Sequence, residues 1–94
     1  MAIKQDSLNS YQRSTVIKIS PNPASNILYV QSIRNIAKPM HFTIFDATGK
    51  ILKTGSNNND NFSIDIHNLS SGIYFLKLYN AYQINICTEK IIVR

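Results

Sequence analysis

Short runs of β-branched and aromatic residues, closed by Asn, Asp, Gly, Ser or Pro, follow one another along most of the chain. No stretch of helical length carries apolar residues at the 3.6-residue spacing of an amphipathic helix. Runs of this length and composition are typical of β-strands bounded by turns. The sequence therefore predicts an all-β fold with about seven strands. They are expected at Thr15 to Ile19, Asn26 to Ser32, Met40 to Asp46, Lys50 to Thr54, Phe62 to His67, Ile73 to Asn80 and Ile84 to Val93.

The length of the chain limits how these strands are organised. Ninety-four residues with 44% hydrophobic content make one small domain with a single modest core. Met1 to Ser14 show no alternation and are rich in Gln, Ser and Asn, so residues 1-14 are expected to be a linker or tail. Residues 15-94 are expected to form the domain, and the best architecture for seven strands in this length is an immunoglobulin-like or fibronectin-like Greek-key β-sandwich.

Alternation is clearest in the fifth expected strand. Phe62, Ile64 and Ile66 share one face there, and polar residues share the other, as in a sheet with one packed and one solvated face. The sixth expected strand, Ile73 to Asn80, is apolar on both faces. It is therefore either a central strand or a strand that is half exposed as a binding surface.

Turn chemistry supports this segmentation. Asp46-Ala47-Thr48-Gly49 places a φ-tolerant glycine where a tight hairpin needs it. Pro21 and Pro23 lack backbone N–H donors, so the first strand must end just after Ile19. The polar tract Asn57 to Asn61 is expected to be a long exposed loop.

A more specific pattern occurs at Leu69-Ser70-Ser71-Gly72-Ile73-Tyr74. A leucine, a turn glycine and a tyrosine at the start of a strand resemble the tyrosine corner of Greek-key sandwiches. In that corner the ring fills the edge of the core and the hydroxyl donates to an upstream backbone group. The expected role of this segment is mainly structural.

Support for catalysis or metal binding is weak. Ser63, Asp65 and His67 would project from one face of a strand, but two-residue steps separate neighbours by about 7 Å, beyond the reach of a nucleophile and its base. A solvated strand face explains them better. Asp65 and His67, with His41 as a third ligand, would suit a metal, yet nothing in the sequence brings His41 near. Cys87, inside an apolar run, is expected to be a small buried thiol. No catalytic residue, cofactor or metal is expected.

Charge and hydropathy exclude two further classes of function. The net charge of +5 comes from lysines and arginines spread along the whole chain, so the sequence contains no dedicated nucleic-acid patch. No apolar run approaches the roughly 18 to 20 residues of a membrane span, so an integral membrane protein is not expected. Met1 to Tyr11 contain no apolar segment of a secretory signal peptide.

Four segments of the chain, taken in order, resemble one known family. The residues that carry the resemblance are Pro21, Asn22 and Pro23, then Asp46, Gly49 and Lys50, then Leu69, Gly72 and Tyr74, and finally Lys90, Ile91, Ile92, Val93 and Arg94. In this order and spacing the chain resembles the C-terminal sorting domain of the type IX secretion system, type A, over about residues 16 to 94. One departure is Ser20, where the family often has an aromatic residue.

The resemblance implies a non-enzymatic address label at the C-terminus of exported proteins in Bacteroidetes-type bacteria. A cargo protein would be fused N-terminally, and the precursor would pass through the periplasm before the type IX translocon carries it across the outer membrane. An outer-membrane shuttle protein would then collect it. A surface sortase would remove the domain by cutting within Met1 to Ser14, which leaves the cargo at the cell surface or secreted.

Recognition of such a label needs a surface that unrelated cargos present identically. The candidate for translocon recognition is the terminal strand, Lys90, Ile91, Ile92, Val93 and Arg94, through its backbone edge or its basic ends. The alternative is that Ile91, Ile92 and Val93 only complete the core. A mainly structural role is expected for the other family-motif residues, namely Pro21, Asn22, Pro23, Asp46, Gly49, Lys50, Leu69, Gly72 and Tyr74.

Two other functions remain open. A carbohydrate-binding or adhesive β-sandwich module would use exposed Tyr11, Tyr79 and Tyr82 as stacking platforms. An edge-paired structural or oligomerising domain is the other, since an open sandwich offers unpaired strands.

Overall fold

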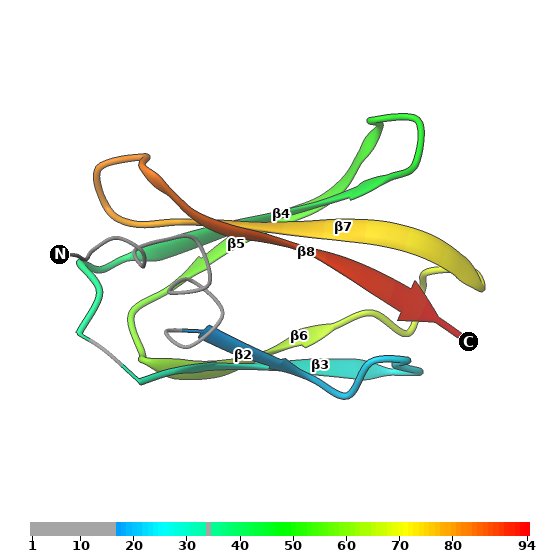
Figure 1. Cartoon of the computed structure of the whole chain (residues 1–94), viewed down its shortest axis with the longest axis horizontal. Helices are drawn as coiled ribbons and strands as arrows, with labels where there is room; N and C mark the ends of the chain where they lie inside the picture. Colours follow the sequence, from blue (N-terminus) through cyan, green and yellow to red (C-terminus); the bar gives the residue numbers. More distant parts are fainter. Residues whose placement is uncertain (1–16, 34) are drawn as a thin grey trace, which may run out of the picture.

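The computed structural model describes residues 17–33 and 35–94, which form two antiparallel β-sheets packed face to face (Figure 1). The all-β prediction is confirmed for these residues. The strands are β2 (Ile17–Ser20), β3 (Ile27–Ser32), β4 (Met40–Asp46), β5 (Ile51–Asn57), β6 (Asn61–Asp65), β7 (Gly72–Tyr79) and β8 (Asn85–Val93). The expected tail at residues 1-14, together with Thr15 and Val16 of the first expected strand, lies outside the described residues.

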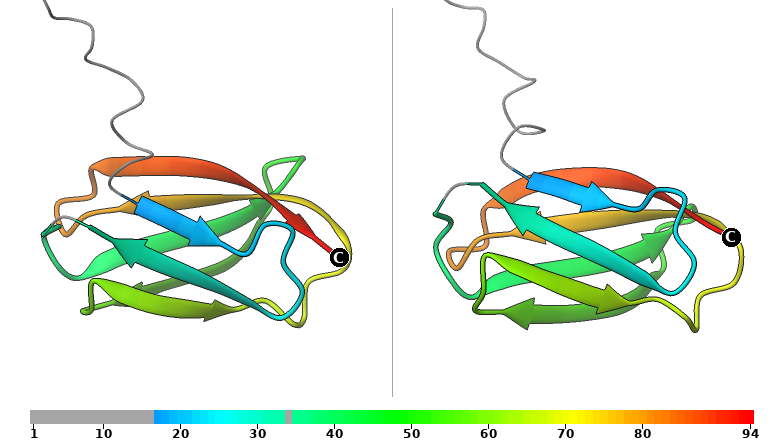
Figure 2. Two further views of the ribbon diagram at one scale, coloured as in Figure 1. Left: turned by 60° about the horizontal axis from the view of Figure 1, so that its bottom comes forward. Right: turned by 90° about the horizontal axis from the view of Figure 1, so that it is seen from below.

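The order of the strands is that of a Greek-key sandwich. One sheet has the order β2-β3-β6 and the other β5-β4-β7-β8. The chain crosses between sheets after β3, β5 and β6, so β3 pairs with β6 and β4 with β7 although neither pair is consecutive (Figure 2). This is the immunoglobulin-like architecture that the sequence predicts. β7 lies between β4 and β8 and is thus a central strand of its sheet, as one of the two sequence interpretations expected.

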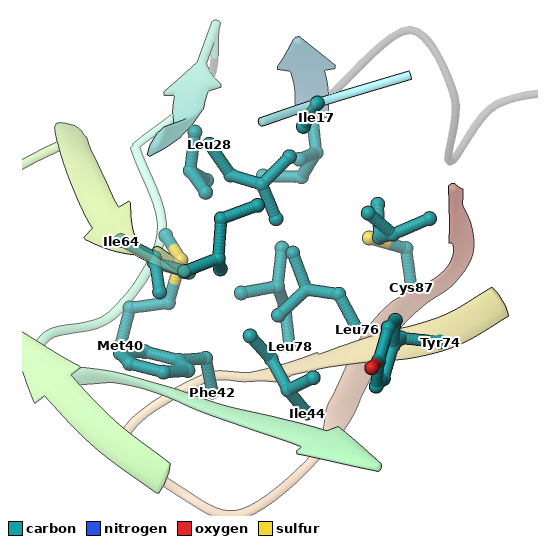
Figure 3. Packing of buried hydrophobic residues seen from close by; sticks show 14 of the residues in the cluster. Ile17, Leu28, Met40, Phe42, Ile44, Ile64, Tyr74, Leu76, Leu78 and Cys87 are labelled. Carbon is teal, nitrogen blue, oxygen red and sulfur yellow. The ribbon is translucent and has the colours of Figure 1, made fainter. Parts of the chain in front are cut away.

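The core fills the space between the two sheets (Figure 3). Leu28, Met40, Leu76 and Leu78 are 0% exposed, and each such side chain contributes about 1.5–3 kcal/mol relative to an exposed one. The alternation expected for the fifth strand is confirmed, since Ile64 and Ile66 are buried and Phe62 packs against the core; Cys87 is buried too. A core of this size, drawn from both sheets, holds the turns at the ends of the sandwich in fixed positions.

The polar tract is where the predicted boundaries fail most. Asn57 still pairs with Met40, and Asn61 already pairs with Gln31, so only residues 58–60 connect β5 to β6. The long exposed loop predicted for Asn57 to Asn61 is therefore wrong. Backbone hydrogen bonding between strands does not depend on side-chain polarity. The pairing of Asn57 with β4 and of Asn61 with β3 therefore outweighs the low strand propensity of asparagine.

β5 is also longer than the predicted Lys50 to Thr54, because it continues to Asn57. Gly55 lies in this continuation and faces the ring of Phe42, in register with it. A Cβ at Gly55 would come within 2.6 Å of Phe42 Cε2, so only glycine lets that ring lie over the strand. Gly55, which follows directly after the predicted end of this strand, is therefore a packing position within it.

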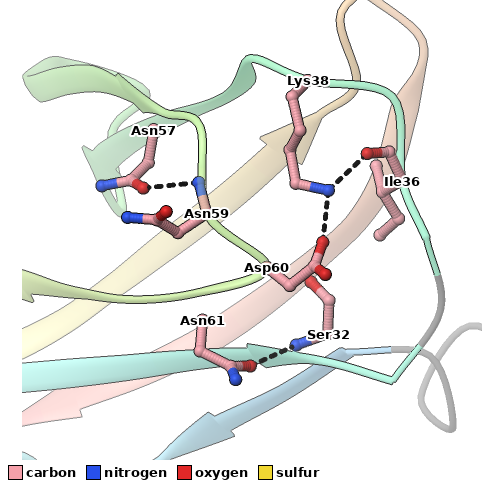
Figure 4. Close-up of polar contacts among 7 residues, drawn as sticks. All are labelled: Ser32, Ile36, Lys38, Asn57, Asn59, Asp60 and Asn61. Carbon is pink, nitrogen blue, oxygen red and sulfur yellow. Dashed lines mark hydrogen bonds and ion pairs between the residues drawn. The ribbon is translucent and has the colours of Figure 1, made fainter.

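A polar network closes the end of the sandwich at which β3 and β5 finish (Figure 4). Lys38 Nζ donates to the backbone carbonyl of Ile36 at 2.5 Å and forms an ion pair with Asp60. Asn61 Oδ1 accepts from the Ser32 amide at 3.2 Å. These contacts tie the β3–β4 connection to the short β5–β6 turn. β2, through which the chain enters the described domain, begins at this same end.

Candidate functional site

All four family motifs lie at the other end of the sandwich, and we call this the motif end. It is formed by the Pro21–Pro23 turn after β2, the 46–50 hairpin after β4, the 66–72 segment before β7 and the last residues of β8. The antiparallel registers require this, because Asp46 pairs with Tyr74 and Tyr74 with Ile91. Segments far apart in sequence therefore lie at the same end of the sandwich (Figures 1 and 2).

The Pro21–Pro23 turn is bonded directly to β8. Asn22 Nδ2 donates to the Lys90 carbonyl at 2.8 Å, and Asn22 Oδ1 accepts from the Ile92 amide at 3.0 Å. Ala24 then pairs in parallel with β8, donating to the Ile92 carbonyl at 2.8 Å and accepting from the Arg94 amide at 2.9 Å. The turn thus occupies four backbone groups on the outer edge of β8. We call this set of contacts the β8 clamp.

The clamp explains why the first motif has this sequence. Proline cannot donate a ladder hydrogen bond, so strand pairing with β3 stops at Ser20 as expected. The asparagine amide has both a donor and an acceptor and so mimics one residue of backbone against β8. Sequence reasoning classed Asn22 as structural but missed the contact, and it missed Ala24, which is only 1% exposed.

Side chains of the terminal strand alternate between core and solvent. Ile91 and Val93 are 1% and 2% exposed, whereas Ile92 is 38% exposed and Lys90 and Arg94 are exposed. Ile91 and Val93 therefore complete the core, as one interpretation of this segment expected. The side chains on the opposite face of the strand are accessible to a partner, as the other interpretation requires. Contact of Lys90 to Arg94 with a translocon component stays a prediction.

Asp46 organises the hairpin between β4 and β5. Its Oδ1 accepts from the Thr48 hydroxyl at 2.6 Å, the Thr48 amide at 2.9 Å and the Lys50 amide at 3.0 Å. Gly49 has a φ of +93°, the left-handed region that favours glycine, so the predicted tight hairpin is confirmed. The hydrogen bond from the Thr48 hydroxyl, followed by that from the Lys50 amide, holds the pKa of the Asp46 carboxyl below its ordinary value.

The predicted tyrosine corner is also present. The Tyr74 hydroxyl donates to the Ser70 carbonyl at 2.5 Å, and its ring is 7% exposed at the edge of the core. Leu69 packs against the same core from the segment before β7, and Gly72 begins that strand. The 66–72 segment is thereby fixed to β7 on the side where the Asp46 hairpin lies.

The Asp65 and His67 side chains lie closer together than the sequence suggested. His67 Nδ1 is 2.6 Å from Asp65 Oδ1, and the His67 amide donates to the same oxygen at 3.0 Å. The predicted separation of about 7 Å assumed a continuous strand. It is wrong for this pair because β6 ends at Asp65 and the chain turns. The His67 amide, and then the His67 ring, hold the pKa of Asp65 below its ordinary value.

These groups do not extend into a larger chemical site. His41, the third ligand considered, lies on β4 in the other sheet, and Ser63 lies within β6. Within residues 17–33 and 35–94, no three His, Cys, Asp or Glu side chains are grouped so as to hold a metal ion. The Asp65–His67 contact closes a turn at the end of a strand.

Two of the tyrosines considered as stacking platforms, Tyr79 and Tyr82, lie at the end of the sandwich opposite the motif end. Tyr82 is 74% exposed in the β7–β8 connection, away from the motif end. Tyr79 lies at the end of β7 with Lys77 Nζ 5.7 Å from its ring centroid, and Tyr11 is outside the described residues. In the part of the chain that the structure describes, no helix is long and apolar enough to cross a membrane.

The fold and this arrangement define a class of protein: a small Greek-key sandwich whose sequence motifs converge on one end. The chain belongs to the secretion system C-terminal sorting domain family, whose model matches residues 18–94. This is the type IX sorting family that the sequence resembles, so the resemblance is confirmed. Membership implies export to the cell surface or secretion. A search among curated proteins gives no match.

The fold also occurs in a solved structure. The chain is similar to part of PorZ, described as an essential bacterial surface component of the type-IX secretion system of human oral-microbiomic Porphyromonas gingivalis. The two are 15% identical with a TM-score of 0.65 over 88% of this chain. Only 12% of the PorZ chain is covered, so this chain corresponds to one small part of that protein.

Proposed function

We propose that this chain is a non-catalytic secretion signal that directs an N-terminally attached cargo through the type IX outer-membrane translocon. The observation that carries the proposal is the convergence of all four family motifs on one end, away from the end at which β2 enters the domain. A cargo attached before β2 leaves the motif end uncovered. A partner protein that recognises the motif end would therefore contact the same surface for every attached cargo.

The outward side chains of the terminal strand are our candidates for recognition. Lys90, Ile92 and Arg94 face solvent, whereas Ile91 and Val93 are held in the core. Because the clamp already occupies the Lys90 carbonyl and the Ile92 amide, a partner of this segment would bind through side chains. The partners proposed are the translocon, an outer-membrane shuttle protein and a surface sortase that cuts within residues 1–14 after passage through the periplasm.

The test is a fusion of residues 1–94 behind a signal-peptide-bearing fluorescent protein in a bacterium with a working type IX system. We expect the reporter at the cell surface or in the medium, shortened by the mass of the domain. The matched control is the same reporter without residues 1–94, which should stay in the periplasm. A folded, intact fusion that also stays in the periplasm would contradict the proposed function.

Carbohydrate binding is a second candidate, and one surface favours it. A shallow depression on the outer face of the β2-β3-β6 sheet surrounds Tyr29, which is 51% exposed, and its lining includes polar residues as well as Val30 and Phe62. An exposed ring flanked by amides and hydroxyls such as Gln31, Asn61 and Ser63 is suited to stack on a sugar and bond its hydroxyls. A glycan array with wild type and Tyr29→Ala decides it, because binding that needs Tyr29 supports this candidate and no binding removes it.

A further inference from the structure

The outer face of the β5-β4-β7-β8 sheet is apolar near the motif end. Register places Ile51, Phe45 and Phe75 side by side across β5, β4 and β7, and places Ile73 opposite Ile92 one step closer to the end. Phe45, Ile73, Phe75 and Ile92 alternate with the buried positions of their strands, and Ile51 is the register partner of Phe45, so the five side chains point away from the core. We call them the apolar patch.

The apolar patch is exposed to a degree that is unusual for such side chains. Ile51, Ile73 and Ile92 are 61%, 49% and 38% exposed. The rings of Phe45 and Phe75 are stacked at 5.7 Å between centroids and are half-buried. A contiguous set of large apolar side chains on a sheet face marks an interaction surface more often than a single exposed leucine does.

The charges around the patch are mainly positive, and the exception is the Asp46 carboxyl, which the β4–β5 hairpin holds beside Lys50. Lys90 is the register partner of Phe75 on β8, Lys77 follows two residues further along β7, and Lys50 precedes Ile51. The four strands of this sheet contain two acidic residues in the described structure. Glu89 alternates with Lys90 and belongs to the other side of β8, and Asp46 accepts three hydrogen bonds within its own hairpin. A partner that covers this face is therefore complementary if it carries carboxylates.

We propose that the apolar patch and its lysines form the docking surface for a protein of the secretion machinery whose own surface has an apolar centre with carboxylates around it. The inference rests on the proposed function and extends it from the terminal strand to the sheet face beside it. The two phenylalanines supply rigid contact area at the centre, and the lysines at the edge steer association and fix orientation.

The apolar contribution is tested with the double variant Ile73→Thr/Ile92→Thr in the full-chain reporter fusion. Threonine keeps the β-branched shape, so the strands are retained while apolar area is lost. The matched control is Ile33→Thr/Ile84→Thr, which changes the same residue type at 70% and 61% exposed positions away from the motif end. We expect the patch variant to lower the exported fraction about tenfold or more and the control to leave it unchanged. Both purified chains should melt within a few degrees of wild type.

The charge contribution is tested with Lys90→Glu against Lys18→Glu, which is exposed on the other sheet. Only Lys90→Glu should reduce export, and the reduction should be larger at low ionic strength of the medium. A photo-crosslinking residue at position 73 should capture a protein of the secretion system in exporting cells, and the same residue at position 33 should not.

The outcomes separate this inference from the proposed function. If the wild-type fusion is not exported, the proposed function fails. If it is exported and the patch variant is exported equally well, the docking surface is wrong while the function stands. Crosslinks from position 73 only to a second copy of this chain, or to lipid, would also overturn the docking surface.

Discussion

Asp46 shows how much of the motif end depends on single hydrogen bonds. One carboxylate oxygen accepts hydrogen bonds from two amides and a hydroxyl, in addition to the two backbone hydrogen bonds that close the hairpin. The aspartate of the motif is thus explained by local turn chemistry. The same holds for Tyr74, whose hydroxyl fixes the 66–72 segment.

The first prediction concerns the pH dependence that Asp46 confers. Its pKa is lower in the folded chain than in the unfolded one, so its ionised form stabilises the fold above about pH 4, and this contribution is lost as the pH falls through the lowered pKa. The side-chain amide of an Asp46→Asn variant does not titrate. Urea unfolding should show wild type more stable than Asp46→Asn at about pH 7, with the difference shrinking as the pH falls below about 4. A difference that is constant with pH would contradict this explanation.

The second prediction concerns the tyrosine corner. Tyr74→Phe keeps the ring but removes the hydrogen bond to the Ser70 carbonyl, and it should lower the free energy of unfolding by about 0.5–1.5 kcal/mol. Tyr82→Phe is the control because Tyr82 is 74% exposed, and it should change stability by no more than about 0.5 kcal/mol. Denaturant midpoints measure both. Equal effects of the two variants would mean that the hydrogen bond from the Tyr74 hydroxyl does not stabilise the fold.

At the scale of elements, the strands and turns followed from the sequence where side-chain alternation and turn residues agree. β3, β4, β7 and β8 begin and end within one residue of the prediction, because each is an apolar run bounded by polar residues. The end of β5 did not follow, because Gly55, Ser56 and Asn57 have low strand propensity and are held by pairing with β4.

The candidate site was predictable only in part, for a similar reason. Its motif residues could be identified in the sequence. The β8 clamp could not, because it joins Asn22 to Lys90 and Ile92, which are separated from it by 68 and 70 positions in the chain and are brought close only by the tertiary structure. The apolar patch had a signal in the sequence, since the β7 segment was apolar on both faces. That signal left two interpretations open, and both apply: β7 is central in its sheet, and its outer face is half exposed.

The third prediction concerns the clamp. Asn22→Ala removes both side-chain bonds to β8 and should cost about 1 kcal/mol of unfolding free energy. Hydrogen exchange should accelerate at the Ile92 amide, whose acceptor is lost, more than at amides of β7. Asn58→Ala, an exposed position in the short β5–β6 turn, is the control and should leave both quantities unchanged. Unaltered exchange at Ile92 in Asn22→Ala would show that the clamp does not form.

For the whole molecule, the two ends of the sandwich have different tasks in the proposed function. The end with the Lys38–Asp60 ion pair receives the chain at β2, and the motif end carries the four motifs together with Arg94. If the proposed function holds, the direction of the strands keeps an N-terminally attached cargo apart from the motif end.

The fourth prediction follows from this separation. A small folded domain attached directly after Arg94 should obstruct the motif end and reduce export strongly, while the same domain attached before Met1 should be tolerated. A flexible Gly/Ser linker of about 20 residues after Arg94 should restore part of the export, because it lets the added domain move away. Thermal melting checks that every fusion is folded. Export that is insensitive to a direct fusion after Arg94 would place recognition elsewhere on the domain.

The β8 clamp has a consequence for quality control. Its partners come from the first turn and the last strand of the described domain, so the complete motif end exists only once nearly every strand between them is in place. A truncated, proteolysed or misfolded copy retains each short motif as sequence but not the assembled surface. A partner that recognises the motif end would therefore bind only a completely folded domain. Recognition for export and selection for correct folding would then depend on the same contact.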